Sequence, residues 1–356
     1  MKSVAIIGIV GVPANYGGFE SLVENIIGEN ASKEVKYTIF CSEKSYSKKE
    51  LNYKGANLRY VNIKANGAQS TLYDIASMIY AGNKYDVTLV LGVSGCIFLP
   101  IFRLFNQKKL IVNIDGLEHR RNKWGRFAKW FLRKSEAMAV KFADVIVADN
   151  KGIQDYVYET YHKQSELIAY GGDHVRRNVD RDKQQEILGD YGVKANEYAI
   201  SVCRIEPENN CHIILEAFSK MNIPLIYIGN WERSEYGIEL RKKYSKYPNL
   251  IIHAPEYDLD VLYVLRNNAR CYIHGHSAGG TNPSLVEAMY FGKPIFAYDV
   301  IYNRATTNNN ACYFKTSSEL VNLLNNGKCN GELLKEVAEG KYTWKQIASQ
   351  YEALYF

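Results

Sequence analysis

The chain has 356 residues, of which 47% are apolar and 23% are charged, with a net charge of +6. These proportions exclude a disordered or fibrous chain, and the length exceeds what one hydrophobic core usually serves, so two domains are expected. Residues 1–172 carry 23 Lys and Arg against 16 Asp and Glu, whereas residues 173–356 carry 21 against 22. The excess positive charge therefore predicts an anionic partner for the first half, with nucleic acid and anionic lipid both open as candidates.

Short β-branched runs alternate with longer amphipathic stretches along the whole chain. The predicted strands are Val4–Ile9, Lys36–Cys41, Asn57–Asn62, Val87–Leu91, Leu110–Ile114, Val145–Ala148, Glu166–Ile168, Tyr198–Cys203, Leu225–Ile228, Leu250–His253, Cys271–His274 and Pro294–Ala297. The predicted helices include Phe19–Asn30, Lys123–Phe142, Cys211–Met221 and Pro283–Phe291. This alternation indicates parallel sheets with helices on both faces.

The pattern pauses at the polar residues 175–197, after GGDH at 171–174. We therefore expect one doubly wound domain over 1–172 and a second over 173–341, with a ligand cleft between the carboxyl ends of their strands. No apolar stretch reaches the roughly 20 residues of a spanning helix. The seven cysteines are scattered without a CxxC pair, which favours reduced thiols in a cytosol.

The first predicted strand leads into a glycine-rich loop, GIVGVPANYGGFE at residues 8–20. Glycines at this place let the backbone approach a ligand and leave amides at the start of the next helix. The dinucleotide fingerprint GxGxxG and the loop GxxxxGK[ST] are both absent. The loop is longer than a simple turn requires, which favours ligand contact at Gly17 and Gly18, and a tight turn without a ligand is the alternative.

A second glycine loop, HGHSAGGTNPSLVEAM at residues 274–289, follows an apolar strand and opens a helix. Asn282 suits the N-cap and Pro283 the first helical position. Gly279 and Gly280 leave the turn without side chains, so a sugar or diphosphate can rest on backbone amides near the helix dipole. Glu287, one turn inside the helix, is predicted to meet a ribose hydroxyl pair, with a solvated helix carboxylate as the alternative.

A third loop, RIEPENN at residues 204–210, also follows a predicted strand. Arg204 is placed to neutralise a diphosphate leaving group, and a structural salt bridge is the alternative.

Together with DGLEHRRNKW at 115–124, AYGGDH at 169–174 and YTWKQIASQYEALY at 342–355, these motifs resemble the retaining GT-B glycosyltransferases of the glycogen-synthase-like group. The closer resemblance is to their bacterial polysaccharide branch, which includes rhamnosyltransferases. It implies two Rossmann-like domains facing each other across a cleft, with the helix at 342–356 packing back on the first domain. It also implies a hexosyltransferase that needs neither a metal nor a cofactor. A peripheral location at the inner face of the cell membrane is predicted instead from the basic and aromatic residues 120–134.

The resemblance assigns roles to Arg204, Glu287 and the backbone of 279–282 and narrows the substrates, and the positions of the loops add the other candidates. Catalytic roles fall to Arg204, Glu287 and Asp115. The donor-binding set is Gly17, Gly18, Arg204, Asn209, Tyr257, His274, Gly279, Gly280, Thr281, Asn282, Pro283, Ser284 and Glu287. The group usually has Glu at the position of Gly279 and Lys at that of Asn209, and the less acidic pocket is compatible with a 6-deoxy sugar. The implied reaction moves L-rhamnose from dTDP-rhamnose, with retention, onto a lipid-linked (undecaprenyl diphosphate) oligosaccharide in capsule, exopolysaccharide or cell-wall polysaccharide synthesis.

The acceptor is expected on the loop after the strand Leu110–Ile114. Its predicted contacts are Tyr16, Phe19, Asp115, Glu118 and His119, with Asp115 favoured for positioning the acceptor hydroxyl. Pairing of the loop carboxylates with Arg120 or Arg121 is the alternative. No ligand spacing such as DxD appears near a strand end, so no metal is predicted.

Residues 120–134, RRNKWGRFAKWFLRK, interleave basic and aromatic side chains. On a helix the aromatics at 124, 127 and 131 would share one face, which is typical of a helix lying on an anionic bilayer. The predicted membrane-facing residues are Arg120, Arg121, Lys123, Trp124, Arg126, Lys129, Trp130 and Arg133, and the apolar segment 96–105 could reinforce them. The alternative is a buried helix whose basic face is solvated.

Rival functions remain open at this point. They are a transferase for glucose, galactose, fucose or an N-acetyl sugar, and a GT-B nucleotide-sugar epimerase. A nicotinamide-dependent oxidoreductase is disfavoured by the missing GxGxxG. No common nucleic-acid-binding motif accompanies the basic half, so nucleic acid is not predicted as a partner.

Overall fold

The computed structural model describes residues 1–14, 17–30, 33–121 and 124–356. These residues form two compact units. Unit 1 comprises Met1–Gly171 with Trp344–Phe356, and unit 2 comprises Gly172–Thr343. Within the described ranges, no helix is both long and apolar enough to cross a bilayer.

Unit 1 is built on a sheet in the order β3-β4-β2-β1-β5-β6-β7-β8, parallel except for the pairing of β3 with β4. Its strands are β1 Lys2–Ile7, β2 Val35–Ser42, β3 Asn52–Tyr53, β4 Ala56–Val61, β5 Val87–Leu91, β6 Lys109–Asn113, β7 Val145–Ala148 and β8 Glu166–Leu167. Its α-helices are α1 Gly18–Glu29, α2 Ser70–Ala81, α3 Leu99–Phe105, α4 Arg126–Phe142, α5 Lys151–Tyr161 and α14 Trp344–Ala353. The central strands β1, β5 and β6 are almost wholly buried, as expected where helices cover both faces of a parallel sheet.

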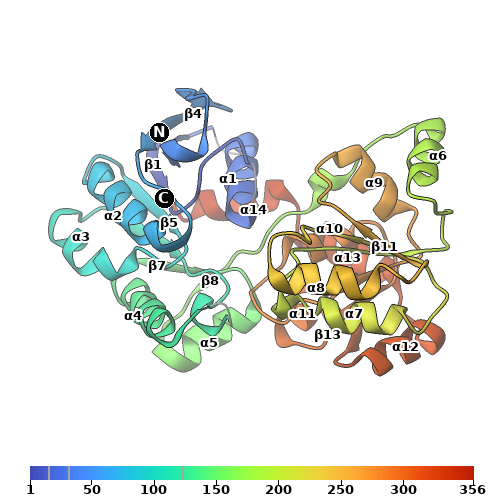
Figure 1. Ribbon diagram of the computed structural model, residues 1–356. Helices are drawn as coiled ribbons and strands as arrows, with labels where there is room; N and C mark the ends of the chain where they lie inside the picture. Colours follow the sequence, from blue (N-terminus) through green and yellow to red (C-terminus); the bar gives the residue numbers. More distant parts are fainter. Residues whose placement is uncertain (15–16, 31–32, 122–123) are drawn as a thin grey trace. The chain divides into compact units, whose positions relative to one another are not determined.

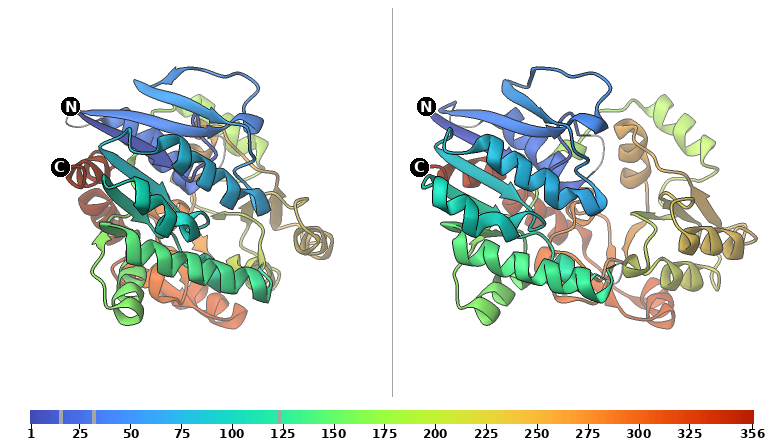
Figure 2. Two further views of the ribbon diagram at one scale, coloured as in Figure 1. Left: turned by 90° about the vertical axis from the view of Figure 1, so that its left-hand side faces the viewer. Right: turned by 60° about the vertical axis from the view of Figure 1, so that its left-hand side comes forward.

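Helix α14 completes unit 1 from the far end of the chain, beside α1 (Figure 1). It buries an apolar face at i, i+3, i+4 and i+7 that includes Trp344, Ile347 and Tyr351. The Tyr351 hydroxyl accepts a 2.8 Å hydrogen bond from the side chain of Asn113, the last residue of β6. On the other face of the sheet, α2, α3 and α4 lie in succession (Figure 2).

Unit 2 contains a fully parallel sheet in the order β11-β10-β9-β12-β13-β14. Its strands are β9 Ala199–Val202, β10 Leu225–Ile228, β11 Leu250–His253, β12 Cys271–His274, β13 Ile295–Tyr298 and β14 Cys312–Phe314. Its α-helices are α6 Arg181–Asp190, α7 Cys211–Phe218, α8 Glu235–Tyr244, α9 Leu259–Asn267, α10 Pro283–Met289, α11 Ile301–Thr306, α12 Ser317–Asn326 and α13 Gly331–Lys341. Strand β9 pairs with β10 on one side and β12 on the other, so the strand order reverses between β9 and β12. Parallel sheets bind ligands beyond the carboxyl ends of strands at such a switch point.

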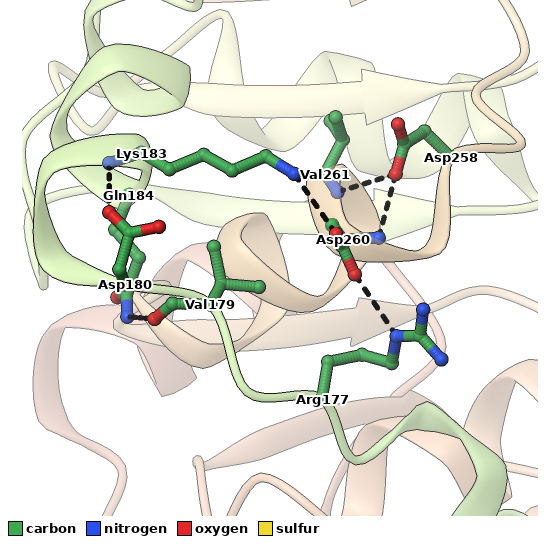
Figure 3. A network of polar contacts seen from close by, with 8 residues as sticks. All are labelled: Arg177, Val179, Asp180, Lys183, Gln184, Asp258, Asp260 and Val261. Atoms are coloured by element: carbon green, nitrogen blue, oxygen red, sulfur yellow. Dashed lines mark hydrogen bonds and ion pairs between the residues drawn. The ribbon is translucent and has the colours of Figure 1, made fainter.

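The polar segment 175–197, expected as a connection, contains helix α6. Asp180 caps this helix by accepting a 2.9 Å hydrogen bond from the Lys183 amide. Asp260 of α9 holds the segment to the rest of unit 2 through Arg177 Nε and Lys183 Nζ, each 3.0 Å away (Figure 3). The helix was missed because its sequence, RDKQQEILGD, buries only Ile187 and Leu188 and shows little apolar periodicity.

Candidate active site

The loops that follow β9 and β12 are joined at the switch point of unit 2. Asn210 donates its side-chain amide to the Gly275 carbonyl at 2.8 Å. Ser277 donates both its backbone amide and its hydroxyl to the Glu208 carbonyl, at 2.9 and 2.8 Å. A Cβ on Gly275 would lie 2.1 Å from the Asn209 carbonyl oxygen, so only glycine permits this approach. The two loops therefore form one connected surface at the carboxyl edge of the sheet.

Arg204 and Asn209 occupy different roles on the first of these loops. The Arg204 side chain is 39% exposed, and its guanidinium lies 4.0 Å from the Glu206 carboxylate, at the limit of an ion pair. It therefore keeps an accessible positive charge. Asn209 is buried and donates its side-chain amide to the Arg204 carbonyl at 2.7 Å, which braces the loop from within.

The second loop turns into α10 through Gly279, whose φ of +106° is a conformation that residues with a side chain rarely adopt. Asn282 is the N-cap and accepts from the Ser284 amide at 3.1 Å, and also from the Ser284 hydroxyl at 2.8 Å. Pro283 occupies the first turn and has no amide hydrogen. The Ser284 amide is therefore engaged by the cap and does not face a ligand. An approaching anion would contact the backbone from Gly279 to Asn282, a stretch that includes Gly280 and the buried Thr281.

Glu287 lies one turn into α10 within a buried ion pair. Its Oε2 is 2.7 Å from Arg266 Nη2, and the Arg266 side chain is only 5% exposed. Its Oε1 is 3.5 Å from His174 Nε2. Burial raises the pKa of Glu287, but the charge of Arg266 and the contact with His174 outweigh it, so the pKa is lowered overall. Glu287 is thus a fixed carboxylate rather than a solvated one.

Two further predicted donor residues lie in contrasting environments. His274, at the end of β12, is buried, and neither ring nitrogen has a hydrogen-bond partner among the described residues. Burial lowers its pKa to about 3, so the ring is neutral at physiological pH. It stacks on His276, with ring centroids 4.3 Å apart. Tyr257 lies before α9 and is exposed.

In unit 1, the glycine loop is held by Glu20 of α1. This buried carboxylate accepts a 2.8 Å hydrogen bond from the Val10 amide, and a Cβ on Gly17 would lie 1.9 Å from its Oε2. Burial raises the pKa of Glu20 against the effect of the Val10 bond. Gly18 is the first residue of α1, and the Phe19 ring lies 6.5 Å from that of Tyr170. Of the predicted acceptor residues, Tyr16 lies outside the described residues.

The loop after β6 has a constrained backbone. Asp115 and Leu117 have φ values of +60° and +55°, in the left-handed region where side chains are uncommon. Such conformations persist only where the surrounding structure enforces them, and they cluster at functional sites. The Asp115 amide donates to the Asn113 side chain at 3.0 Å, and the Asp115 charge is one of the influences that raise the pKa of Glu20.

The remaining acceptor candidates of this loop have protein partners. Glu118 forms an ion pair with Arg121, whose Nε lies 2.8 Å from Glu118 Oε1, and this is the pairing considered as the alternative. Glu118 also accepts a 2.9 Å hydrogen bond from the Trp124 indole. His119 Nδ1 lies 3.0 Å from the carboxylate of Glu136 on α4. Glu136 is fully buried and also accepts from the hydroxyls of two tyrosines of α5, Tyr156 and Tyr161, both at 2.8 Å.

The basic aromatic segment differs in detail from the expectation. Helix α4 begins at Arg126, so Trp124 precedes it, and the stacked exposed pair is Phe127 and Trp130 rather than the aromatics at 124, 127 and 131. Arg121 does not fit a membrane-facing role, because its side chain is 11% exposed and paired with Glu118. Arg120, Arg126 and Arg133 are exposed and Lys129 is half-buried, whereas Lys123 lies outside the described residues.

Arg266, His174 and Glu136 were absent from the predicted site. A sequence signal existed for two of them. Arg266 follows Leu262 and Leu265 on the buried face of α9, and Glu136 falls on the apolar face of α4, four residues after Leu132. A charged residue on such a face needs a buried partner.

Family models match both parts of the chain. Residues 1–173 match a domain of unknown function (DUF1972), and residues 183–326 match the glycosyl transferases group 1. No curated protein matches the chain.

Several solved structures share the fold at low sequence identity. Sucrose-phosphate synthase from Thermosynechococcus elongatus has a TM-score of 0.82 at 14% identity, over 100% of this chain and 98% of the other. Anabaena Alr3699/HepE in complex with UDP-glucose has a TM-score of 0.76 at 13% identity, over 99% of both chains. A putative UDP-N-acetylglucosamine 2-epimerase from Listeria monocytogenes has a TM-score of 0.62 at 14% identity, over 99% of this chain and 95% of the other. The α/β fold with two Rossmann-like sheets is therefore that of GT-B proteins.

Proposed function

We propose that this group 1 glycosyltransferase of GT-B fold, with its N-terminal DUF1972 domain, takes a nucleoside diphosphate sugar as donor on unit 2. The observation that carries the proposal is the joined pair of loops at the β9–β12 switch point, with the accessible charge of Arg204 and the fixed carboxylate of Glu287. A guanidinium matches the geometry of phosphate oxygens, and a carboxylate can accept hydrogen bonds from a ribose diol. The fold shared with HepE, whose structure contains UDP-glucose, supports the same assignment.

In the proposed reaction, the bond between the anomeric carbon and the diphosphate oxygen breaks while the acceptor oxygen bonds to that carbon from the same face. Arg204 and the backbone at 279–282 stabilise the charge that develops on the departing diphosphate. A leaving phosphate oxygen takes the proton of the acceptor hydroxyl, so the configuration is retained without a covalent enzyme intermediate. Asp115 orients the acceptor hydroxyl by accepting a hydrogen bond from it.

For the substrates, we propose dTDP-L-rhamnose and a lipid-linked (undecaprenyl diphosphate) oligosaccharide in capsule, exopolysaccharide or cell-wall polysaccharide synthesis. Gly279 stands where related enzymes usually have Glu, and a sugar without a 6-hydroxyl has less need of that carboxylate. Transferases for glucose, galactose, fucose or an N-acetyl sugar are the alternatives. The likeness to an epimerase makes nucleotide-sugar epimerisation the rival activity, and a strict requirement for an added acceptor would exclude it.

The enzyme is proposed to work in the cytoplasm at the inner face of the membrane, with α4 on anionic headgroups. Arg126, Lys129 and Arg133 would supply the attraction, which for each basic residue is worth about 1 kcal/mol. Replacing all three by Glu should release the protein from vesicles that contain phosphatidylglycerol. Unchanged partitioning of that variant would refute this role.

The donor site is tested by titration calorimetry with UDP, dTDP and GDP sugars. Arg204→Ala should weaken the binding of the preferred donor about 10- to 100-fold, because a hydrogen bond to a charged group is worth about 1.5–3 kcal/mol. Arg181→Ala, at an exposed position on α6, is the matched control and should bind as the parent does. If Arg204→Ala binds the donor as tightly as this control, the assignment is wrong.

A further inference from the structure

Helix α3 presents an apolar surface that the described part of unit 1 leaves uncovered. Leu104 is 81% exposed, Ile101 is 55% exposed and Phe105 is 43% exposed. Scattered single apolar residues on a surface are normal, but three on one seven-residue helix form a concentrated patch.

The one charged residue of α3 does not interrupt this patch. Arg103 donates from Nε to the Phe142 carbonyl and from Nη1 to the Lys108 carbonyl, both at 2.9 Å. Its Nη2 lies 2.6 Å from the Asp144 carboxylate, and the side chain is 16% exposed. The guanidinium is therefore held against the protein, and the outer side of the helix is wholly apolar.

The neighbouring helix α4 packs against α3, and the charged residues that it exposes are all positive. Its exposed charged residues are Arg126, Arg133, Lys134 and Lys141. Its one acidic residue, Glu136, is buried and saturated with hydrogen bonds. Phe127 and Trp130 are exposed on the same helix and stack with ring centroids 5.9 Å apart.

We infer that α3 inserts into the hydrocarbon boundary of an anionic lipid bilayer while α4 rests on the headgroups. An apolar helix packed against a helix that exposes cations and an aromatic pair matches the order of a bilayer surface, in which acyl chains lie beneath anionic headgroups. A second copy of the chain would place the cations of one α4 against those of another. A nucleic acid would use the cations but would leave the α3 side chains in water. The inference rests on the membrane association proposed for α4 and adds an inserted element to it.

The test uses the full chain and vesicles of phosphatidylcholine with or without phosphatidylglycerol. For the double variant Ile101→Ser/Leu104→Ser, the partition coefficient into anionic vesicles should be lower by a factor of about ten or more. The reason is that the burial of an aliphatic side chain contributes roughly that factor or more. Ile238→Ser, at an exposed position on α8 of unit 2, is the matched control and should bind as the parent does.

A second measurement reports insertion directly. Leu104→Trp should show a blue shift of its added emission with anionic vesicles that high salt does not abolish once binding is saturated, whereas Ile238→Trp should not. Unchanged partitioning of the double variant, or no shift for Leu104→Trp, would overturn the inference. Self-association in sedimentation velocity that Ile101→Ser/Leu104→Ser abolishes would overturn it too, in favour of a contact between copies. Donor affinity, measured on the same variants, should equal that of the parent, so a failure here is distinct from a failure of the donor site.

Discussion

The ion pair of Glu287 and Arg266 should contribute to stability and to donor binding in separable ways. Glu287→Ala would leave the Arg266 guanidinium, whose side chain is 5% exposed, without its counter-charge. Removing one partner of a buried pair costs about 3–5 kcal/mol. For a unit of this size, each kcal/mol lowers the unfolding midpoint by about 2–4 °C, so the expected decrease is about 6 °C or more.

The compensating variant is Arg266→Met/Glu287→Leu, which replaces both charges by apolar side chains. Such replacements are often neutral for stability, so the midpoint of unit 2 should return to within a few degrees of the parent. Donor affinity should not return, because the ribose would still lack its carboxylate. Comparison of the two variants therefore separates a structural role of Glu287 from a role in donor binding. Glu287→Ala alone would not distinguish these roles, because it removes both.

Scanning calorimetry is the assay. The transition of unit 2 is identified as the one whose midpoint temperature rises when a nucleoside diphosphate binds. The lowered pKa of Glu287 sets the sign of the pH dependence. The contribution of the carboxylate is fully present above its unfolded pKa of about 4.5 and is lost as the pH falls through the folded value. A decrease of less than about 1 kcal/mol in the free energy of unfolding for Glu287→Ala would refute the reasoning. So would a double variant whose unfolding midpoint does not recover.

Two further predictions concern the supports of the loops. Glu136→Gln should destabilise unit 1 by about 2–3 kcal/mol at pH 7, because His119 and the two tyrosines lose a charged acceptor. Because the pKa of Glu136 is lowered by these partners in spite of burial, the difference from the parent should shrink as the pH falls through the folded value. Urea titrations of the variant and of the exposed control Glu159→Gln check this, and equal midpoints would contradict it. Gly275→Ala should destabilise unit 2 by about 2 kcal/mol or more, because its Cβ would meet the Asn209 carbonyl. The control Gly189→Ala adds a Cβ in open space on α6 and should be neutral or stabilising, so a calorimetric midpoint of Gly275→Ala at or above that of the control would refute the steric argument.

The fold class followed from the alternation of short apolar strands and amphipathic stretches, because that pattern is local in sequence. Elements with weak periodicity did not follow, as α6 shows. The joined loops of unit 2 were only partly predictable. Asn282 and Pro283 announce the start of α10 by their residue types, whereas the bonds from Ser277 and Asn210 link residues more than 60 positions apart.

The details of single side chains were the least accessible from sequence. Trp124 has the right spacing for the face of α4, but it precedes the N-cap Gly125 and lies outside the helix, and its indole donates to Glu118 instead. Arg204, by contrast, retains the exposed position that its place at a strand end suggested. The pairing of Glu287 with Arg266 depends on the packing of α9 against the rest of unit 2, which no local pattern encodes.

The chain leaves unit 1 after Gly171 and re-enters it at Trp344, so unit 2 is an insertion within unit 1. The two junctions, 171/172 and 343/344, lie in contact with each other. The Gly172 amide donates to the Tyr342 carbonyl at 2.8 Å, and Gly171 lies against the Trp344 side chain. Residues 172–343 can therefore be excised as one continuous segment whose ends already lie side by side. A short linker between 171 and 344 would close the remainder, which makes the two halves of the enzyme separable for expression. Truncation at the carboxyl terminus, by contrast, would damage the unit that begins at residue 1.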